Sequence, residues 1–189
     1  QSNGELNISG DGGYTGGIAL AGGKLNAVDD LTLAGTVSIS ASSEIIVPTG
    51  STLVLNQTGG LSLGATTLTL SGGGTFSNTN ALVLNDENSL LSLAGILTIG
   101  DVKGTAASNT GKGIQVSSSA TLGDYDLSAE SYLAIAANQT LAGQLNLQSN
   151  GELNISGDGG YTGGIALAGG KLNAVDDLTL AGTVSISAS

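Results

Sequence analysis

The stretch GELNISGDGGYTGGIALAGGKLNA, residues 4–27, returns without a single change at residues 151–174. Within it, apolar residues alternate with small or polar ones in short segments, such as LNI at 6–8 and IAL at 18–20. A period of two residues is typical of β-strands, because successive side chains of a strand point to opposite faces. Runs of glycine separate the segments, and glycine is favoured in tight turns. The stretch therefore predicts short strands joined by tight turns.

The same alternation continues along the chain at intervals of roughly seven residues, whereas a β-sandwich would space its strands by about 8–12 residues. No segment has the apolar spacing of an amphipathic helix. The further alternating segments are Leu31–Leu33, Val37–Ile39, Leu53–Leu55, Leu61–Leu63, Leu68–Leu70, Leu82–Leu84, Ile96–Ile99, Ile114–Val116, Tyr132–Ile135 and Leu145–Leu147.

The duplication extends to residues 1–42, which are identical to residues 148–189. The chain thus holds one 147-residue unit, residues 1–147, and the start of the next, residues 148–189. Packing tolerates many substitutions, so identical exposed residues indicate tandem copying, and we expect further copies in the same polypeptide. No spacer rich in proline, glycine and serine separates the two units.

These intervals lead to a fold. Three segments of roughly seven residues make a loop of about 21 residues, and 147 is seven times that length. We predict one continuous all-β parallel β-helix (β-solenoid) over residues 1–189, with three short strands per coil and about seven coils per unit. Coils stack about 4.8 Å apart, so each unit would lengthen the axis by roughly 34 Å.

The remaining residues fit this fold. Glycine would form the corners, Pro48 would occupy a turn, and asparagine and serine would form ladders at corners along the axis. The segment Val102–Lys112 lacks alternation, which predicts an extended loop. Tyr14 is expected to pack at a corner rather than to stack on a sugar.

Composition excludes several function classes. The chain has no cysteine, histidine or arginine, and its net charge is −11. One unit holds eleven acidic residues and three lysines, or −8, which argues against a nucleic-acid partner. Without cysteine there is no disulfide framework and no thiolate metal site, a composition that fits an exported protein. No apolar run reaches the length of a membrane span, so we expect no membrane insertion of this segment.

The candidate catalytic groups are carboxylates, because the usual general base and thiol nucleophile are missing. Asp124 and Asp126 are two residues apart, so on a strand they share a face, and Glu130 follows; a β-helix glycosidase would use such a pair. Exposed solubilising charges are the more common explanation. We therefore predict no catalytic, cofactor-binding or metal site.

A structural calcium ion is the alternative for the acidic turns at Ser9–Gly13, Val28–Asp30 and Asp86–Glu87, because calcium takes carboxylate and carbonyl oxygens. The nonapeptide and EF-hand calcium motifs are missing. The run Gly10–Gly17 lacks the lysine and following helix of a phosphate-binding loop. Thr67-Leu68-Thr69 is the one Thr-x-Thr triplet, which argues against an ice-binding face.

The duplicated stretch resembles the passenger-associated transport repeat of bacterial autotransporters and related surface adhesins. Its Tyr14-Thr15-Gly16-Gly17 core is the specific part, and the match covers Gly4–Leu25 and again Gly151–Leu172. The other matching residues are Gly4, Leu6, Ile8, Ser9, Gly10, Leu20, Gly23 and Leu25, with a degenerate echo at Leu68–Phe76. The chain departs from that family at Ile18-Ala19, where the family usually has two threonines. The resemblance implies a right-handed β-helix that is secreted, surface-exposed and often adhesive.

We therefore expect a structural segment of a long extracellular β-solenoid that forms a bacterial surface fibre, stalk or adhesin shaft, and not an enzyme. Its partners would be further copies of the repeat, other fibre chains or cell-surface glycans. A module that binds carbohydrate or a host surface, through corners rich in aspartate and asparagine or through the loop Val102–Lys112, is the alternative function. A carbohydrate-active β-helix enzyme is a second alternative.

Overall fold

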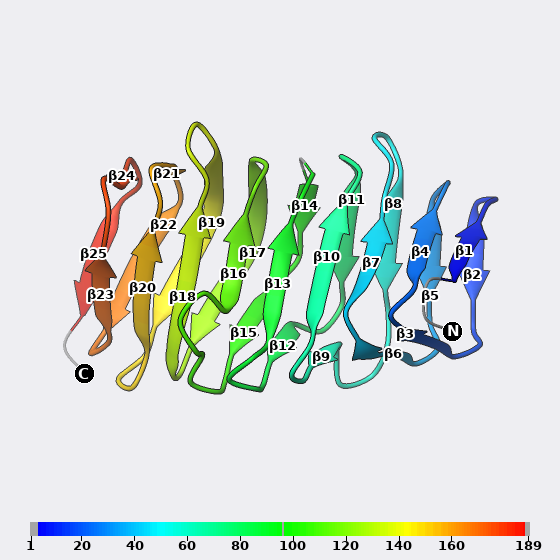
Figure 1. Cartoon of the computed structure of the whole chain (residues 1–189), viewed down its shortest axis with the longest axis horizontal. Coiled ribbons are helices and arrows are strands. Elements are labelled where there is room, and N and C mark those ends of the chain that lie inside the picture. Colours follow the sequence, from blue (N-terminus) through cyan, green and yellow to red (C-terminus); the bar gives the residue numbers. More distant parts are fainter. Residues whose placement is uncertain (1–3, 96, 188–189) are drawn as a thin grey trace.

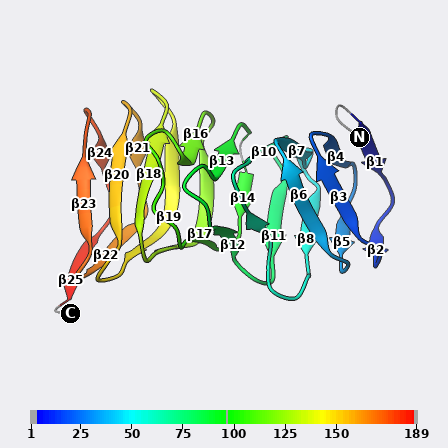
Figure 2. The ribbon, with the colours of Figure 1, turned by 60° about the horizontal axis from the view of Figure 1, so that its bottom comes forward.

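Parallel strands are stacked in successive coils, and each coil adds one layer to every face of the molecule (Figure 1). The computed structural model describes residues 4–95 and 97–187. Their regular structure is all β-strand, so the predicted β-solenoid is confirmed. The first strand, β1 (Glu5–Ile8), and the last, β25 (Val184–Ser187), lie at opposite ends of the long axis (Figures 1 and 2). Right-handed winding stays a prediction.

Face 1 is a nine-stranded parallel sheet with one strand from each coil. Partners in neighbouring coils are between 19 and 25 residues apart in the sequence. Seven coils separate β1 from β20, its counterpart in the second unit, so the predicted average of 21 residues per coil is confirmed. After β1 the strands are, in order, β4 (Lys24–Ala27), β7 (Ser43–Ile46), β10 (Thr67–Ser71), β13 (Leu90–Leu93), β16 (Gly113–Val116), β18 (Glu130–Ile135), β20 (Glu152–Ser156) and β23 (Lys171–Ala174).

Faces 2 and 3 are formed by the strands that follow each face-1 strand. Face 2 contains β2 (Gly12–Tyr14), β5 (Leu31–Leu33), β8 (Thr52–Leu55), β11 (Thr75–Asn78), β14 (Leu97–Ile99), β21 (Gly160–Tyr161) and β24 (Thr179–Leu180). Face 3 contains β3 (Ile18–Ala21), β6 (Val37–Ala41), β9 (Ser62–Leu63), β12 (Leu82–Leu84), β15 (Val102–Gly104), β22 (Gly164–Ala168) and β25. Ile96, which the sequence places in the β14 segment, lies outside the described residues.

Two coils depart from the predicted three short strands. In the coils that begin with β16 and β18, one eight-residue strand supplies both face 2 and face 3. These strands are β17 (Ala120–Leu127) and β19 (Thr140–Leu147), and their mutual register shifts between Thr121 and Asp124. Gly143 in β19 has φ 135°, a conformation that glycine adopts readily, so the chain bends there without ending the strand.

Face 3 is interrupted near the first end of the molecule. Strands β3 and β6 pair only with each other among the described strands (Figure 2). Beyond β6, the side chain of Gln57 replaces a strand: its Oε1 accepts a hydrogen bond from the Val37 amide at 2.5 Å, and its Nε2 donates to the Gly60 carbonyl. The buried Gln57 amide therefore satisfies backbone groups that a neighbouring strand would otherwise pair.

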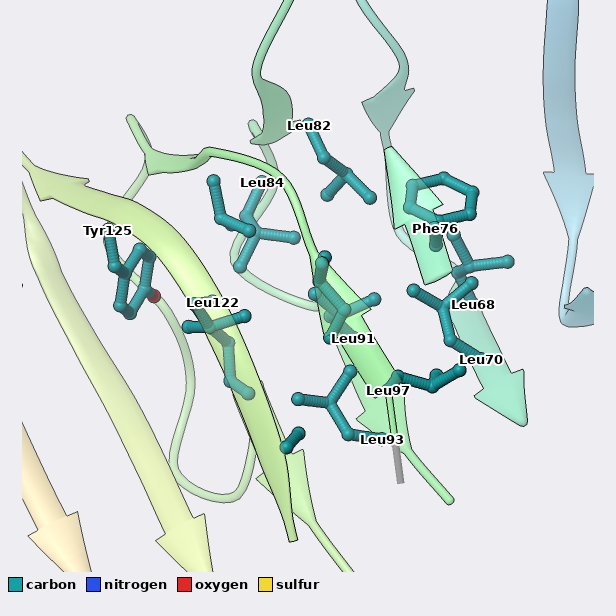
Figure 3. Close-up of a cluster of buried hydrophobic side chains, with 14 of the residues drawn as sticks. Leu68, Leu70, Phe76, Leu82, Leu84, Leu91, Leu93, Leu97, Leu122 and Tyr125 are labelled. Atoms are coloured by element: carbon teal, nitrogen blue, oxygen red, sulfur yellow. The ribbon is translucent and has the colours of Figure 1, made fainter. Parts of the chain in front are cut away.

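The core is a set of apolar columns that run along the axis. One inward column of face 1 passes through Leu25, Ile45, Leu70, Leu93 and Val116, each in register with the next. Figure 3 shows the same arrangement in the middle coils, where Phe76, Leu82, Leu84, Leu91 and Leu93 point into one interior. Such columns explain the alternation, because every second side chain of a strand lies inside.

The corners contain the predicted glycines and proline. Gly72, at φ 116°, passes so close to the coil below that a Cβ there would lie 2.1 Å from the Val47 carbonyl oxygen. Pro48 precedes a turn at Thr49 and Gly50, and its carbonyl accepts a hydrogen bond from the Ser51 amide at 3.0 Å. The turn predicted around Pro48 is thus confirmed.

The predicted loop Val102–Lys112 is wrong in its first part. Val102–Gly104 forms strand β15, and the Val102 side chain is buried in the core. Only residues 105–112 form an irregular segment, and the coils on both sides hold it. The Ser108 amide donates to the Glu130 carbonyl at 2.9 Å, and the Asn109 amide donates to the Glu87 carbonyl at 2.7 Å. Alternation failed as a signal because the second buried residue of this short strand is Gly104, which has no apolar side chain.

Candidate functional surface at the seam between units

The seam between the two units continues the hydrogen-bonded ladders found within a unit. We define the seam as the contact of residues 130–148, which are the last coil of the first unit and the first residue of the second, with residues 151–170, the first coil of the second. Across it β18 pairs with β20, and β19 pairs with both β21 and β22, all in parallel. No linker intervenes, since only the turn at 148–151 separates the two coils, and it closes with a 2.7 Å hydrogen bond from the Gly151 amide to the Gln148 carbonyl.

The two identical copies differ in what lies beneath them. The first coil of the chain has no described coil below it, whereas the same sequence at residues 151–170 sits on residues 130–148. Leu6 is therefore 45% exposed and its copy Leu153 is 0% exposed. Tyr14 is 43% exposed and its copy Tyr161 is 1% exposed. Stacking of one unit on another thus buries apolar side chains that a separate unit exposes to water.

Tyr161 is the largest side chain buried at the seam. Its hydroxyl donates to the Gly143 carbonyl of the coil below at 2.6 Å, and to the Gly164 carbonyl at 3.3 Å. Burial raises the pKa of the Tyr161 phenol, and the negative charge of Asp124 raises it further. The expected packing role of this tyrosine therefore agrees with its position in the second copy.

Polar side chains form ladders both at a corner, as the sequence predicted, where Asn109 donates from Nδ2 to Asn88 Oδ1 at 3.1 Å, and on the outer side of face 1. Asn26 donates from Nδ2 to Asn7 Oδ1 at 2.8 Å, and in the second copy Asn173 donates to Asn154 at 2.9 Å. Stacked amides in register on consecutive coils can extend such a ladder along the axis. The prediction of corner ladders is thus confirmed at Asn88 and Asn109, and the ladders on face 1 were not predicted.

Ion pairs also join side chains of neighbouring coils along the axis. Lys24 Nζ lies 2.8 Å from Glu44 Oε2, and Lys171 Nζ lies 3.4 Å from Glu152 Oε2. The hydrogen bond that Lys24 donates to Glu44 raises the pKa of Lys24, and the negative charge of Glu44 raises it further. Hydrogen bonds from Lys24 and then from Ser71 lower the pKa of Glu44.

Corner carboxylates bind backbone amides of neighbouring coils. Asp29 Oδ2 accepts from the Gly10 amide at 2.7 Å, and its copy Asp176 accepts from Gly157 at 2.9 Å. Asp30 Oδ1 accepts from the Thr52 amide of the following coil at 2.7 Å. Charged acceptors for backbone N–H groups make comparatively strong hydrogen bonds. Sequence reasoning missed this role, although the position of each aspartate at a corner could have suggested it.

The carboxylates considered for catalysis are only partly together. Asp124 and Asp126 do share the outer side of β17, as predicted, with Tyr125 pointing inward between them. Asp126 Oδ1 accepts a hydrogen bond from Asn146 at 2.8 Å. Glu130 lies on face 1 instead, where its Oε1 accepts from Tyr132 and Asn154. The three acids therefore do not converge on one point.

The acidic turns considered for calcium are held by their own hydrogen bonds. Asp86 Oδ1 accepts from the Asn88 amide at 2.9 Å, and Glu87 lies beside it in the same turn. Within residues 4–95 and 97–187, no three acidic side chains are grouped closely enough to hold a metal ion. The same residues contain no helix long and apolar enough to cross a membrane.

Threonines line one shallow depression of the outer surface. Thr52, Thr75, Thr98 and Thr121 are in register on successive coils of face 2, and the last three line a shallow groove of about 240 Å³. The triplet Thr67–Thr69 is not repeated beside itself, because its neighbours in the next coil are Leu90 and Ser92. Among the described coils, Thr52, Thr75, Thr98 and Thr121 thus form one column of threonines. At the triplet Thr67–Thr69 no pair of adjacent threonine columns forms.

Comparisons with known proteins found no match. No protein-family model, no curated protein and no solved structure is significantly similar to this chain.

Proposed function

We propose that the chain is a segment of a long, secreted β-solenoid rod on a bacterial cell surface, where it serves as a fibre, stalk or adhesin shaft. The seam is the observation that carries this proposal. Since one unit joins the next through the same parallel ladders that join coils inside a unit, additional units lengthen the rod without a hinge. The role is mechanical, and it needs no catalytic group.

The composition and the resemblance support the extracellular setting. A chain without cysteine is insensitive to the redox state of its surroundings. Its excess of negative charge keeps parallel rods apart in solution. The resemblance of residues 4–25 and 151–172 to the transport repeat of surface adhesins points to the same location.

The test is the length of the particle as a function of copy number. Chains with one, two and three extra 147-residue units would be imaged by electron microscopy. We expect straight particles that grow by roughly 34 Å per unit, which is seven coils at about 4.8 Å each. In a matched control, a flexible glycine-serine linker at residue 148 should introduce a visible joint. Jointed particles without the linker, or lengths that do not increase evenly, would contradict the proposal.

Location is tested separately on cells that make the protein. Antibodies against the Thr105–Lys112 segment should label intact cells, and protease added outside should remove that signal. Labelling only after the cells are broken would count against an extracellular rod while leaving the solenoid itself untouched.

A further inference from the structure

We propose that residues 151–170 are a docking element with which each unit seats itself on the last coil of the preceding unit. The partner is a second copy of this repeat, and the surface that it offers is residues 130–148. This inference rests on the proposed function only in requiring that units follow one another in one chain. It assigns a specific role to the glycines and the tyrosine of the duplicated stretch.

Two glycines of this element, Gly159 and Gly163, have no room for a side chain. A Cβ on Gly163 would lie 1.7 Å from the Gly143 carbonyl oxygen of the coil below. A Cβ on Gly159 would lie 2.3 Å from Ile135 Cγ2 and 2.8 Å from the Ala136 carbonyl oxygen. Side-chain atoms are not found at such distances, so the two coils approach more closely than any other residue would permit.

The first copy shows that this demand comes from the neighbouring coil. Gly12 has the same sequence neighbours as Gly159, yet a Cβ on Gly12 would meet nothing within 4 Å. Neither glycine has a positive φ, so neither is needed for its own turn. Glycine at this position is therefore explained by the contact between units rather than by local backbone geometry.

Tyr161 adds a polar contact to this close fit. Its ring is buried between the coils, and its hydroxyl reaches the Gly143 carbonyl at 2.6 Å. Gly143 itself has φ 135°, which a residue with a side chain rarely adopts. The docking element thus fits a coil with glycine at this bend. This match would hold successive identical units in register, where a repetitive chain could otherwise slip.

The two copies make a controlled experiment possible in a chain that consists of residues 1–189. Gly159→Ala introduces a methyl group into the seam, and Gly12→Ala introduces the same group in the first copy, which has no coil below it in that chain. Hydrogen exchange followed by mass spectrometry reads each copy separately, because the substituted peptide is heavier by one methylene than its twin. Gly160→Ala and Gly13→Ala label the two copies without crowding, since a Cβ at these positions meets its nearest atoms at 3.6 Å and 4.0 Å.

We expect exchange in the peptide around residue 159 to be faster in Gly159→Ala than in Gly160→Ala by about tenfold or more, as overpacking of a close contact implies. Gly12→Ala and Gly13→Ala should agree within about twofold. Equal exchange in Gly159→Ala and Gly160→Ala would overturn the proposal. So would equal effects of Gly12→Ala and Gly159→Ala relative to their controls.

A gentler pair of variants covers the case in which Gly159→Ala does not fold. Tyr161→Phe keeps the ring and removes the hydroxyl bonded to Gly143, whereas Tyr14→Phe removes a hydroxyl from a partly exposed ring. Exchange at the seam should rise several-fold in Tyr161→Phe alone. No difference between the two would contradict the docking role of Tyr161. The growth of particle length with copy number is independent of these results, so the two proposals can fail separately.

Discussion

Asp29 and Asp30 are adjacent in the sequence, but their carboxylates accept hydrogen bonds from backbone amides of two different coils. Asp29 reaches the Gly10 amide of the preceding coil, and Asp30 reaches the Thr52 amide of the following coil. The sequence offered these two acids as calcium ligands or as solubilising charges. Their hydrogen bonds show that they also join three consecutive coils.

The copy of Asp30 provides the control for a test of this role. Asp30→Ala removes the acceptor of the Thr52 amide and should lower the free energy of unfolding by about 0.5–1 kcal/mol. In a chain that consists of residues 1–189, no coil follows Asp177, so Asp177→Ala removes the same carboxylate without losing such a contact and should change stability by less than about 0.5 kcal/mol. Urea unfolding of both variants gives the comparison, and equal losses would show that the contact with Thr52 is unimportant.

Protonation of Glu44 makes the stability of the fold depend on pH in the acidic range. Hydrogen bonds from Lys24 and Ser71 lower its pKa in the folded state below 4.5, its ordinary value. Its contribution is therefore complete above pH 4.5 and is lost as the pH falls through the lower folded-state pKa. We expect Glu44→Gln to be less stable than the parent at neutral pH and to approach it in acid.

Thermal unfolding between pH 7 and pH 2.5 measures this difference, and Glu87→Gln controls for loss of a carboxylate in an exposed turn. A gap between parent and Glu44→Gln that stays constant over this range would refute the assignment. Lys24 acts at the alkaline side, because its pKa is raised in the folded state. Its contribution to stability is complete below pH 10.5 and is lost as the pH rises through the higher folded-state pKa.

At the scale of elements, the break in face 3 depends on one side chain. Gln57 is buried, and its side-chain oxygen accepts a hydrogen bond from the Val37 amide, which has no strand partner on that side. Gln57→Leu fills a similar volume but leaves this amide unsatisfied, so we expect a loss of about 1–3 kcal/mol and faster exchange of the Val37 amide. Gln139→Leu is a comparison at a half-buried position, where Gln139 Oε1 accepts from Ser119. Unchanged exchange at Val37 would contradict this role of Gln57.

The sequence predicts most strands but not how two coils combine them. Alternation identified twelve of the nineteen described strands of the first unit, because burial of every second side chain is a local property. The strands that it did not identify are β2, β4, β7, β11, β13, β15 and β17. The fusion of faces 2 and 3 in β17 and β19 was not predicted, since Gly123 and Gly143 resemble other corner glycines. Whether a glycine ends a strand or bends it depends on the register with the next coil, which the sequence does not reveal.

For the whole molecule, charge is the property most easily tested. Fifteen acidic residues and four lysines give a net charge of −11 on a narrow rod, so like charges repel along its length. We expect the melting temperature to rise by several degrees between about 0.02 M and 0.5 M sodium chloride, because salt screens this repulsion. A variant with Asp11→Asn, Glu87→Gln and Asp158→Asn should respond less. A melting temperature that falls with salt would show that the ion pairs of Lys24 and Lys171 outweigh the repulsion.

The seam could be anticipated from the duplication, but its close fit could not. Identity of residues 1–42 and 148–189 indicated that units follow one another directly. It could not show that Gly159 and Gly12, with the same neighbours in sequence, differ in what surrounds them. That difference arises from residues of another coil, about 20 positions away in the chain, and only the stacked structure places them together.

The unbroken ladders at the seam also bear on inheritance. Each 147-residue unit ends where the next begins, in register with it. Recombination between neighbouring gene copies would therefore insert or delete whole units and leave the coils on either side unchanged. Members of one population could then differ in the length of the proposed rod without a single altered contact, so that its length would depend on the number of copies rather than on substitutions.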